Sequence, residues 1–220
     1  MRKPATEGSP WKPFEDRRRD RDLKRSAVLQ MAARCFLDRG FTGTKLSDVA
    51  DALNITKPAL YHYFPSKEAI LDECYRLGLE LIEGHSMRIA ASNGSGLDKV
   101  RDFIIAYTTE VATVEYGMCL GRLDDGALSP QTRKRVRSSK RRVDRRLRAF
   151  IAEGIADGSI APGDPKLHSF AIAGALNWIA HWYQADGELK PAEIAARYAD
   201  LLVNGMATRP KAQARKSKRT

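Results

Sequence analysis

Two short apolar runs joined by residues 53–56 most constrain the fold of this chain. Leu46 and Val49 lie before this connection at helical spacing. Ile55 lies within the connection, and Leu60 follows it. This spacing predicts amphipathic helices, and the alternation that indicates strands is absent from the region. Two helices with so short a connection have the length of a helix-turn-helix, although an ordinary helical hairpin fits the spacing alone equally well.

Residues that start and end helices divide this part of the chain into four helices. The first is expected to begin near Arg21 and to end at Gly40, which accepts a positive φ without strain. Asn54 also tolerates the left-handed conformation of a tight turn. Each later helix follows a residue whose hydroxyl can cap it, namely Thr44, Thr56 and Ser66.

Further helices are predicted beyond a flexible polar break at residues 92–96. They lie near 97–115, 130–156, 165–184 and 191–206, with a shorter one near 118–127. The predicted fold class is all-α, with an N-terminal three-helix helix-turn-helix domain and a C-terminal helical domain. The N-terminal domain is expected at 21–66 and the C-terminal domain at 67–207. A flexible basic arm, 1–20, is expected before them and a disordered basic tail, 208–220, after them.

The net charge of +11 is concentrated in three segments, 1–25, 133–148 and 209–220, and the rest of the chain is acidic overall. Segment 133–148 is the densest, with Asp144 as its only acid. Basic ends suggest a polyanionic partner, although terminal charge runs are often only solvated tails. The stretch 17–25 directly precedes a helix, so it is better placed to contact phosphates.

Other features argue against several functional classes. Leu167–Ala185 has no Asp, Glu, Lys or Arg, but its polar residues favour a helix buried in protein over a membrane span. Cys35, Cys74 and Cys119 fit reduced, buried thiols in the cytoplasm, and no export segment follows the N-terminus. No nucleophile–base motif, phosphate loop or metal-ligand spacing appears, so we expect no enzyme, no metal and no cofactor.

The predicted third helix presents groups suited to DNA. Its exposed positions would be Thr56, Lys57, Ala59, Tyr61 and His62. Base edges in the major groove are contacted by groups of this kind: a cation, hydroxyl groups, an aromatic edge and a small residue that meets a thymine methyl.

Residues 24–75, KRSAVLQMAARCFLDRGFTGTKLSDVADALNITKPALYHYFPSKEAILDECY, resemble the N-terminal DNA-binding domain of TetR-family repressors. The similarity includes the GF-T pair after the first helix, the LYHYF block and the SKEAIL start of the fourth helix. It implies a bacterial transcriptional regulator whose third helix enters the major groove. By position, the remaining chain resembles the family's divergent ligand-binding and dimerisation domain.

The resemblance implies DNA-binding roles by position. Some of these residues would lie near base edges and others near phosphates, and Ser47 falls where some relatives place a longer side chain. The arm Arg17–Arg25 would add backbone contacts. The expected set is Lys45, Ser47, Thr56, Lys57, Pro58, Ala59, Tyr61, His62 and Lys67.

The resemblance also implies a homodimer, because a palindromic operator pairs with a two-fold symmetric protein. The last two long helices would form the interface, unless they are a monomeric core pair. The expected interface residues are Ala171, Gly174, Ala175, Trp182, Ile194, Tyr198, Leu201 and Leu202.

A small-molecule effector is expected in the C-terminal domain, in a pocket among the fourth to eighth helices. Each expected lining residue could instead be plain core: Phe103, Tyr107, Val111, Met118, Leu120, Leu123, Phe150 and Trp178. Residues 177–206 further resemble a TetR branch that controls lipid and sterol catabolism, whose members often sense acyl-CoA thioesters.

The sequence leaves open the role of one segment and two other functions for the whole protein. Segment 133–148 could be a solvated face, a surface for CoA phosphates or another anion, or an auxiliary DNA contact. The protein could sense redox state through its cysteines. It could also be an effector-free DNA-binding protein of the same fold.

Overall fold

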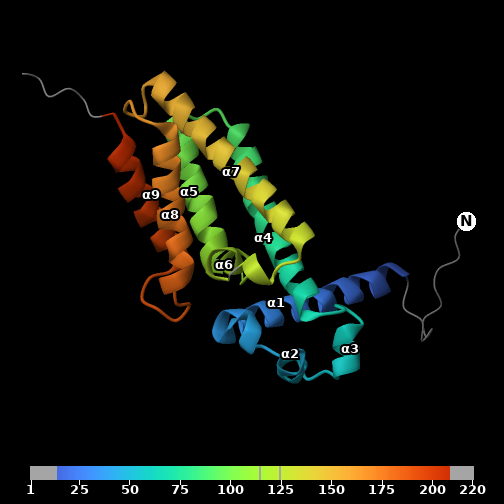
Figure 1. The fold of residues 1–220 in the computed structure, drawn as a ribbon. Coiled ribbons are helices and arrows are strands. Elements are labelled where there is room, and N and C mark those ends of the chain that lie inside the picture. Colours follow the sequence, from blue (N-terminus) through green and yellow to red (C-terminus); the bar gives the residue numbers. More distant parts are fainter. Residues whose placement is uncertain (1–13, 114, 124, 209–220) are drawn as a thin grey trace, which may run out of the picture.

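The computed structural model describes residues 14–113, 115–123 and 125–208, and this part of the chain is almost entirely helical (Figure 1). Its only β-type pairing is an isolated antiparallel bridge between Ile160 and Ala207. The elements are α1 (Phe14–Gly43), α2 (Leu46–Ala52), α3 (Lys57–Tyr61), α4 (Lys67–Ala90), α5 (Gly96–Thr113), α6 (Glu115–Arg122), the 3₁₀ turn η1 (Asp125–Ala127), α7 (Pro130–Asp157), α8 (Pro165–Trp182) and α9 (Pro191–Met206). The predicted all-α fold is confirmed.

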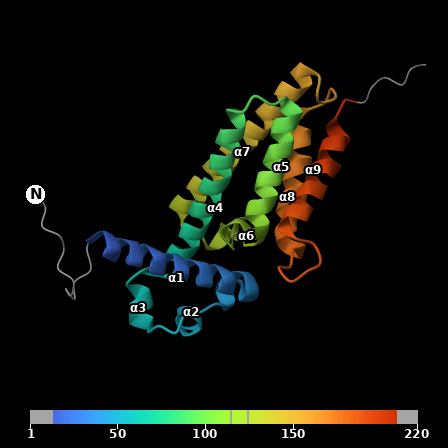
Figure 2. The ribbon, with the colours of Figure 1, turned by 180° about the vertical axis from the view of Figure 1, so that it is seen from behind.

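The helices form a small unit and a larger bundle. Helices α1 to α3 lie at one end, and α4 runs from this unit along the bundle of α5, α7, α8 and α9 (Figures 1 and 2). One apolar core, around Phe36, Leu60 and Tyr75, contains residues from the first four helices, from α6 and from the start of α7. A second core, with Ile104, Ile151 and other buried residues, fills the bundle. Helix α4 therefore connects the two parts mechanically.

The first helix begins at Phe14, seven residues before the expected start near Arg21. Residues 14–20, which were expected in the flexible arm, are therefore helical, and residues 1–13 lie outside the described part. Opposite charges at helical spacing explain the extension, since the Lys24 ammonium pairs with the Asp20 carboxylate four residues away at 2.8 Å.

The capping predictions are confirmed at two of three positions. The Ala59 N–H donates to Thr56 Oγ1 at 3.4 Å, and the Ala69 N–H donates to Ser66 Oγ at 3.1 Å. Thr44 is different, because its buried hydroxyl donates to the carbonyls of Cys35 and Gly40 at the end of α1. The kink at Gly40, where φ is 73°, frees carbonyls that recruit Thr44. Lys45 is the N-cap of α2 instead.

Asn54, in the turn between α2 and α3, adopts the predicted left-handed conformation, with φ at 57°. The uncharged stretch that begins at Leu167 corresponds to α8, which buries one face in the bundle. In the described part of the chain no helix has the length and apolar character needed to cross a membrane.

Helices α5 and α7 meet at two glycines. A Cβ added to Gly96 would lie 2.0 Å from the Gly154 backbone nitrogen, so only glycine permits this approach. We expect Gly96→Ala to lower the free energy of unfolding by about 1–3 kcal/mol, as overpacking does. Gly84→Ala on α4 is the matched control, because no atom lies within 4 Å of its added Cβ and stability should rise slightly. Urea denaturation measures both, and equal effects would contradict the close approach.

Candidate DNA-binding face and effector cavity

Helix α3 is held from one side and exposed on the other. Leu60 is fully buried in the N-terminal core and anchors the helix, while Lys57, Pro58 and Tyr61 face solvent. Tyr61 is 48% exposed, so much of this aromatic side chain is open to contact from outside. An anchored helix with an exposed cation and aromatic ring has the form of a recognition helix.

The structure brings five of the nine predicted DNA-binding residues into one shallow groove of about 410 Å³ between α2, α3 and the start of α4. They are Lys45, Ser47, Lys57, Tyr61 and Lys67. Pro58 and His62 are exposed on or just after α3, Ala59 is half-buried there, and Thr56 caps the helix. Thr42, which the sequence reasoning missed, also lines the groove. Its signal was its position in the exposed segment just after Gly40.

Two basic residues expected to face phosphates are engaged within the fold. The Lys67 ammonium donates to the carbonyls of Phe41 and Thr44 and lies over the Phe41 ring. Arg25 pairs with Glu73 of α4 at 2.8 Å and lies over the Phe64 ring. Their guanidinium and ammonium groups therefore tie α1 to α4. A phosphate contact at Lys67 would rest on its backbone N–H at the helix N-terminus.

A mostly apolar cavity of about 240 Å³ lies among α4, α5, α6, α7 and α8. Three predicted lining residues, Phe103, Tyr107 and Leu120, line it. Ten more were not predicted: Leu79, Ile82, Lys140, Val143, Asp144, Leu147, Phe170, Ala173, Leu176 and Asn177. A cavity that combines an apolar wall with a few polar groups is the form of a small-molecule site.

The other five residues expected at the pocket lie elsewhere. Val111 and Phe150 are buried in the bundle core, and Met118 and Leu123 pack against core residues. Trp178 is 61% exposed on the outer side of α8, where it stacks on His181. The sequence identifies apolar faces but not which of them encloses a void, so these residues could not be separated from true lining.

The polar groups of the cavity mark its opening. The Tyr107 hydroxyl donates to the Asn177 side-chain oxygen, and burial raises the pKa of Tyr107 to about 12. Tyr107 therefore stays a neutral hydrogen-bonding group at physiological pH. Lys140, Phe170 and Asn177 are exposed, whereas Leu147 and Leu176 are buried. The cavity thus opens between α7 and α8, beside a lysine.

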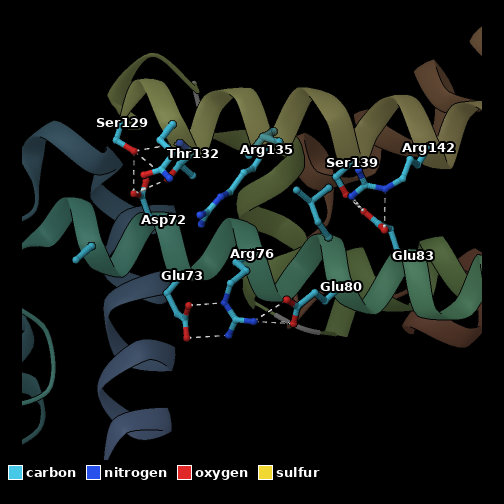
Figure 3. A pocket seen from close by; sticks show the side chains of 14 residues that line it. Asp72, Glu73, Arg76, Glu80, Glu83, Ser129, Thr132, Arg135, Ser139 and Arg142 are labelled. Carbon is cyan, nitrogen blue, oxygen red and sulfur yellow. Dashed lines mark hydrogen bonds and ion pairs between the residues drawn. The ribbon is translucent and has the colours of Figure 1, made fainter.

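A second cleft, of about 630 Å³, lies between α4 and α7 and is lined mainly by charged and polar side chains (Figure 3). The Asp72 carboxylate accepts hydrogen bonds from Ser129 and Thr132, and Glu83 pairs with Arg142 at 2.7 Å. Arg76 bridges Glu73 and Glu80 (Figure 3). The contacts of Asp72 and Glu83 thus join α4 to α7.

The charges along this cleft extend to the small unit of α1, α2 and α3. Hydrogen bonds from Arg76 and then Arg25 hold the pKa of Glu73 at about 2, although partial burial opposes them. Glu73 is therefore ionised at physiological pH and links α1 to α4. Because Leu79 and Ile82 of the same helix line the apolar cavity, α4 contacts both a ligand-sized space and the small unit of α1, α2 and α3.

The outer faces of α8 and α9 carry large apolar side chains that remain largely exposed in the described chain. Leu167, Trp178 and Leu201 are 66%, 61% and 71% exposed. Of the predicted interface residues, Ala171, Gly174, Trp182 and Leu201 are exposed, and Ala175, Tyr198 and Leu202 are half-buried. Ile194 is buried in the bundle core, because its side of α9 packs on α5. Exposed aromatic rings on the face of a helix are typical of a protein–protein interface.

The three cysteines are free and buried, as expected. A hydrogen bond between the Cys74 and Cys119 thiols, together with burial, raises the pKa of Cys74 well above its usual value, and burial raises the pKa of Cys35. Both effects disfavour the reactive thiolate. No group of three or more potential metal ligands occurs in the described residues.

Comparison with known proteins matches both parts of the chain. Residues 28–74 match the model of bacterial regulatory proteins of the tetR family, and residues 93–206 match that of the tetracyclin repressor-like C-terminal domain. The HTH-type transcriptional repressor KstR2 from Rhodococcus jostii is 28% identical over 84% of this chain and 92% of its own length.

Solved structures agree with these matches. A TetR-family regulator, PfmR from Thermus thermophilus, is 30% identical with a TM-score of 0.72 over 80% of this chain and 97% of its own. AibR, solved in complex with isovaleryl coenzyme A and operator DNA, is 26% identical with a TM-score of 0.72 over 82% of this chain and 98% of its own. The chain therefore belongs to the TetR family of bacterial transcriptional regulators.

Proposed function

We propose that this protein is a repressor that binds a palindromic DNA operator as a homodimer and is released by a small-molecule effector. The exposed face of α3, anchored by Leu60 and carrying Lys57 and Tyr61, is the observation that carries the proposal. One helix in one major groove reads few bases, so a second copy extends the site. The unpartnered apolar faces of α8 and α9 supply a surface for that copy.

The effector is proposed to occupy the cavity that opens between α7 and α8. Its apolar wall suits an acyl group, and Lys140 at the opening suits an anionic group. AibR was crystallised with isovaleryl coenzyme A and operator DNA, which supports an acyl-CoA thioester as the effector class here.

Release would follow if the effector binds more tightly to a conformation that does not fit DNA. Helix α4 could transmit the change, because its Leu79 and Ile82 line the cavity while its Glu73 holds Arg25 of α1. An effector that moves α4 against α7 would shift the recognition unit. The operator-bound state must then bind the effector less tightly.

A cavity-filling substitution tests the effector site. Ala173→Phe should leave operator affinity within about twofold but abolish release, because the added ring occupies space that the acyl group needs. Electrophoretic mobility shifts measure operator binding and its release. Unchanged release in the Ala173→Phe variant would contradict the proposed site.

The effector class is identified by thermal shifts with acyl-CoA thioesters, free fatty acids and neutral aromatic compounds, since a ligand raises the melting temperature by mass action.

A further inference from the structure

The outward face of α7 carries cations that have no ion-pair partner within the described residues. Arg137, Lys140 and Arg141 are all exposed. We refer to these three residues as the cationic track. Placing like charges on consecutive turns of one helix is unfavourable unless an anion compensates them. The track therefore needs an explanation beyond the stability of the fold.

Three other arginines of the same helix are engaged with neighbouring side chains. Arg142 forms an ion pair with Glu83 of α4, Arg146 donates to Ser86 of α4, and Arg148 pairs with Asp144. These residues stabilise packing against neighbouring helices. The contrast separates a structural set of arginines from the unpaired set that faces solvent.

The cationic track is continuous with the effector cavity. Lys140 lines the cavity at its opening, and Arg137 precedes it by three residues, so the two side chains are neighbours on the helix surface. Arg137 and Arg141 line a groove of about 530 Å³ along α7. Arg133 also lines this groove, and its guanidinium donates to the backbone carbonyls of Gly126 and Leu128. These hydrogen bonds fix the position of the Arg133 side chain.

We propose that the cationic track binds the phosphate groups of an effector whose acyl part occupies the cavity. This inference rests on the proposed effector function and assigns the phosphate-binding residues. A free fatty acid presents one carboxylate, which Lys140 alone would match, whereas several cations along a groove match several phosphates. Guanidinium groups also bind phosphate oxygens in a bidentate manner. Helix α1 lies between α7 and α3 in both views, which disfavours contact of α7 with the DNA that α3 would bind (Figures 1 and 2).

Charge reversal on α7 tests the assignment by isothermal titration calorimetry with the full chain. Isovaleryl-coenzyme A, coenzyme A and 3′-dephospho-coenzyme A are the probes. Arg137→Glu and Arg141→Glu should each weaken binding of coenzyme A roughly tenfold, the factor expected for a lost charge-assisted contact. Arg145→Glu is the matched control, because it makes the same charge change one turn away, outside the groove and the cavity. It should change binding by less than about twofold.

The outcomes separate this inference from the proposed function. If isovaleryl-coenzyme A releases operator DNA equally well from the wild type and both track variants, the track assignment is wrong and the effector function stands. If the track variants lose coenzyme A binding but no acyl-CoA releases DNA from the wild type, the track assignment holds and the acyl-CoA function fails. Equal losses in Arg141→Glu and Arg145→Glu, or weaker operator binding without weaker coenzyme A binding, would overturn the track.

Discussion

Replacing Tyr61 with Ala is expected to lower operator affinity by about a hundredfold or more. Each lost base or phosphate contact costs roughly 1–3 kcal/mol, and a dimer loses the contact twice. The fold should survive, because Tyr61 is exposed on α3 and the buried Leu60 keeps its anchoring role. Fluorescence anisotropy with a labelled operator measures the loss.

Met87→Ala on α4 is the control for Tyr61→Ala, because it also removes an exposed apolar side chain. It should bind operator like the wild type. Sedimentation should show the same oligomeric state for both variants. Unchanged operator affinity in Tyr61→Ala would exclude the assigned docking of α3.

Replacing Trp178 with Glu is expected to weaken the dimer by roughly a thousandfold. A central aromatic residue in an interface commonly contributes about 2 kcal/mol or more, and two-fold symmetry places it in the interface twice. Burying a carboxylate against the partner's apolar face adds to the cost. Leu201→Glu on α9 should act in the same direction, since Leu201 is also highly exposed.

Sedimentation velocity over a concentration series measures this effect, and Met87→Glu is the matched control away from α8 and α9. Operator affinity should fall together with dimerisation, because a monomer contacts only one half-site. If Trp178→Glu sediments as the wild type does at every concentration, α8 is not the interface.

Local features of the fold were predictable where one residue type has one physical reason. The hydroxyls of Thr56 and Ser66 cap α3 and α4, and Asn54 takes the left-handed turn. The start of α1 was not predicted, because charged residues such as Asp20 and Lys24 carry no apolar period. Thr44 was misassigned because its partner carbonyls exist only after α1 kinks at Gly40.

The proposed effector cavity was predicted only in part, since a void depends on how several helices pack. Phe103, Tyr107 and Leu120 line it, but Trp178 was expected inside and lies outside. The apolar period of α8 does not distinguish the face that packs on the bundle from the face that stays exposed. The recognition helix was more predictable, because its exposed residues follow from one short amphipathic segment.

Selection of bound duplexes from a random DNA library tests the central claim most directly. A two-fold dimer with one recognition helix per copy should enrich an inverted repeat whose half-sites are separated by about one helical turn, 10–10.5 base pairs, or a multiple of it. The Tyr61→Ala variant should enrich nothing under the same conditions. Enrichment of a single unrepeated half-site, or no enrichment by the wild-type protein, would contradict the account.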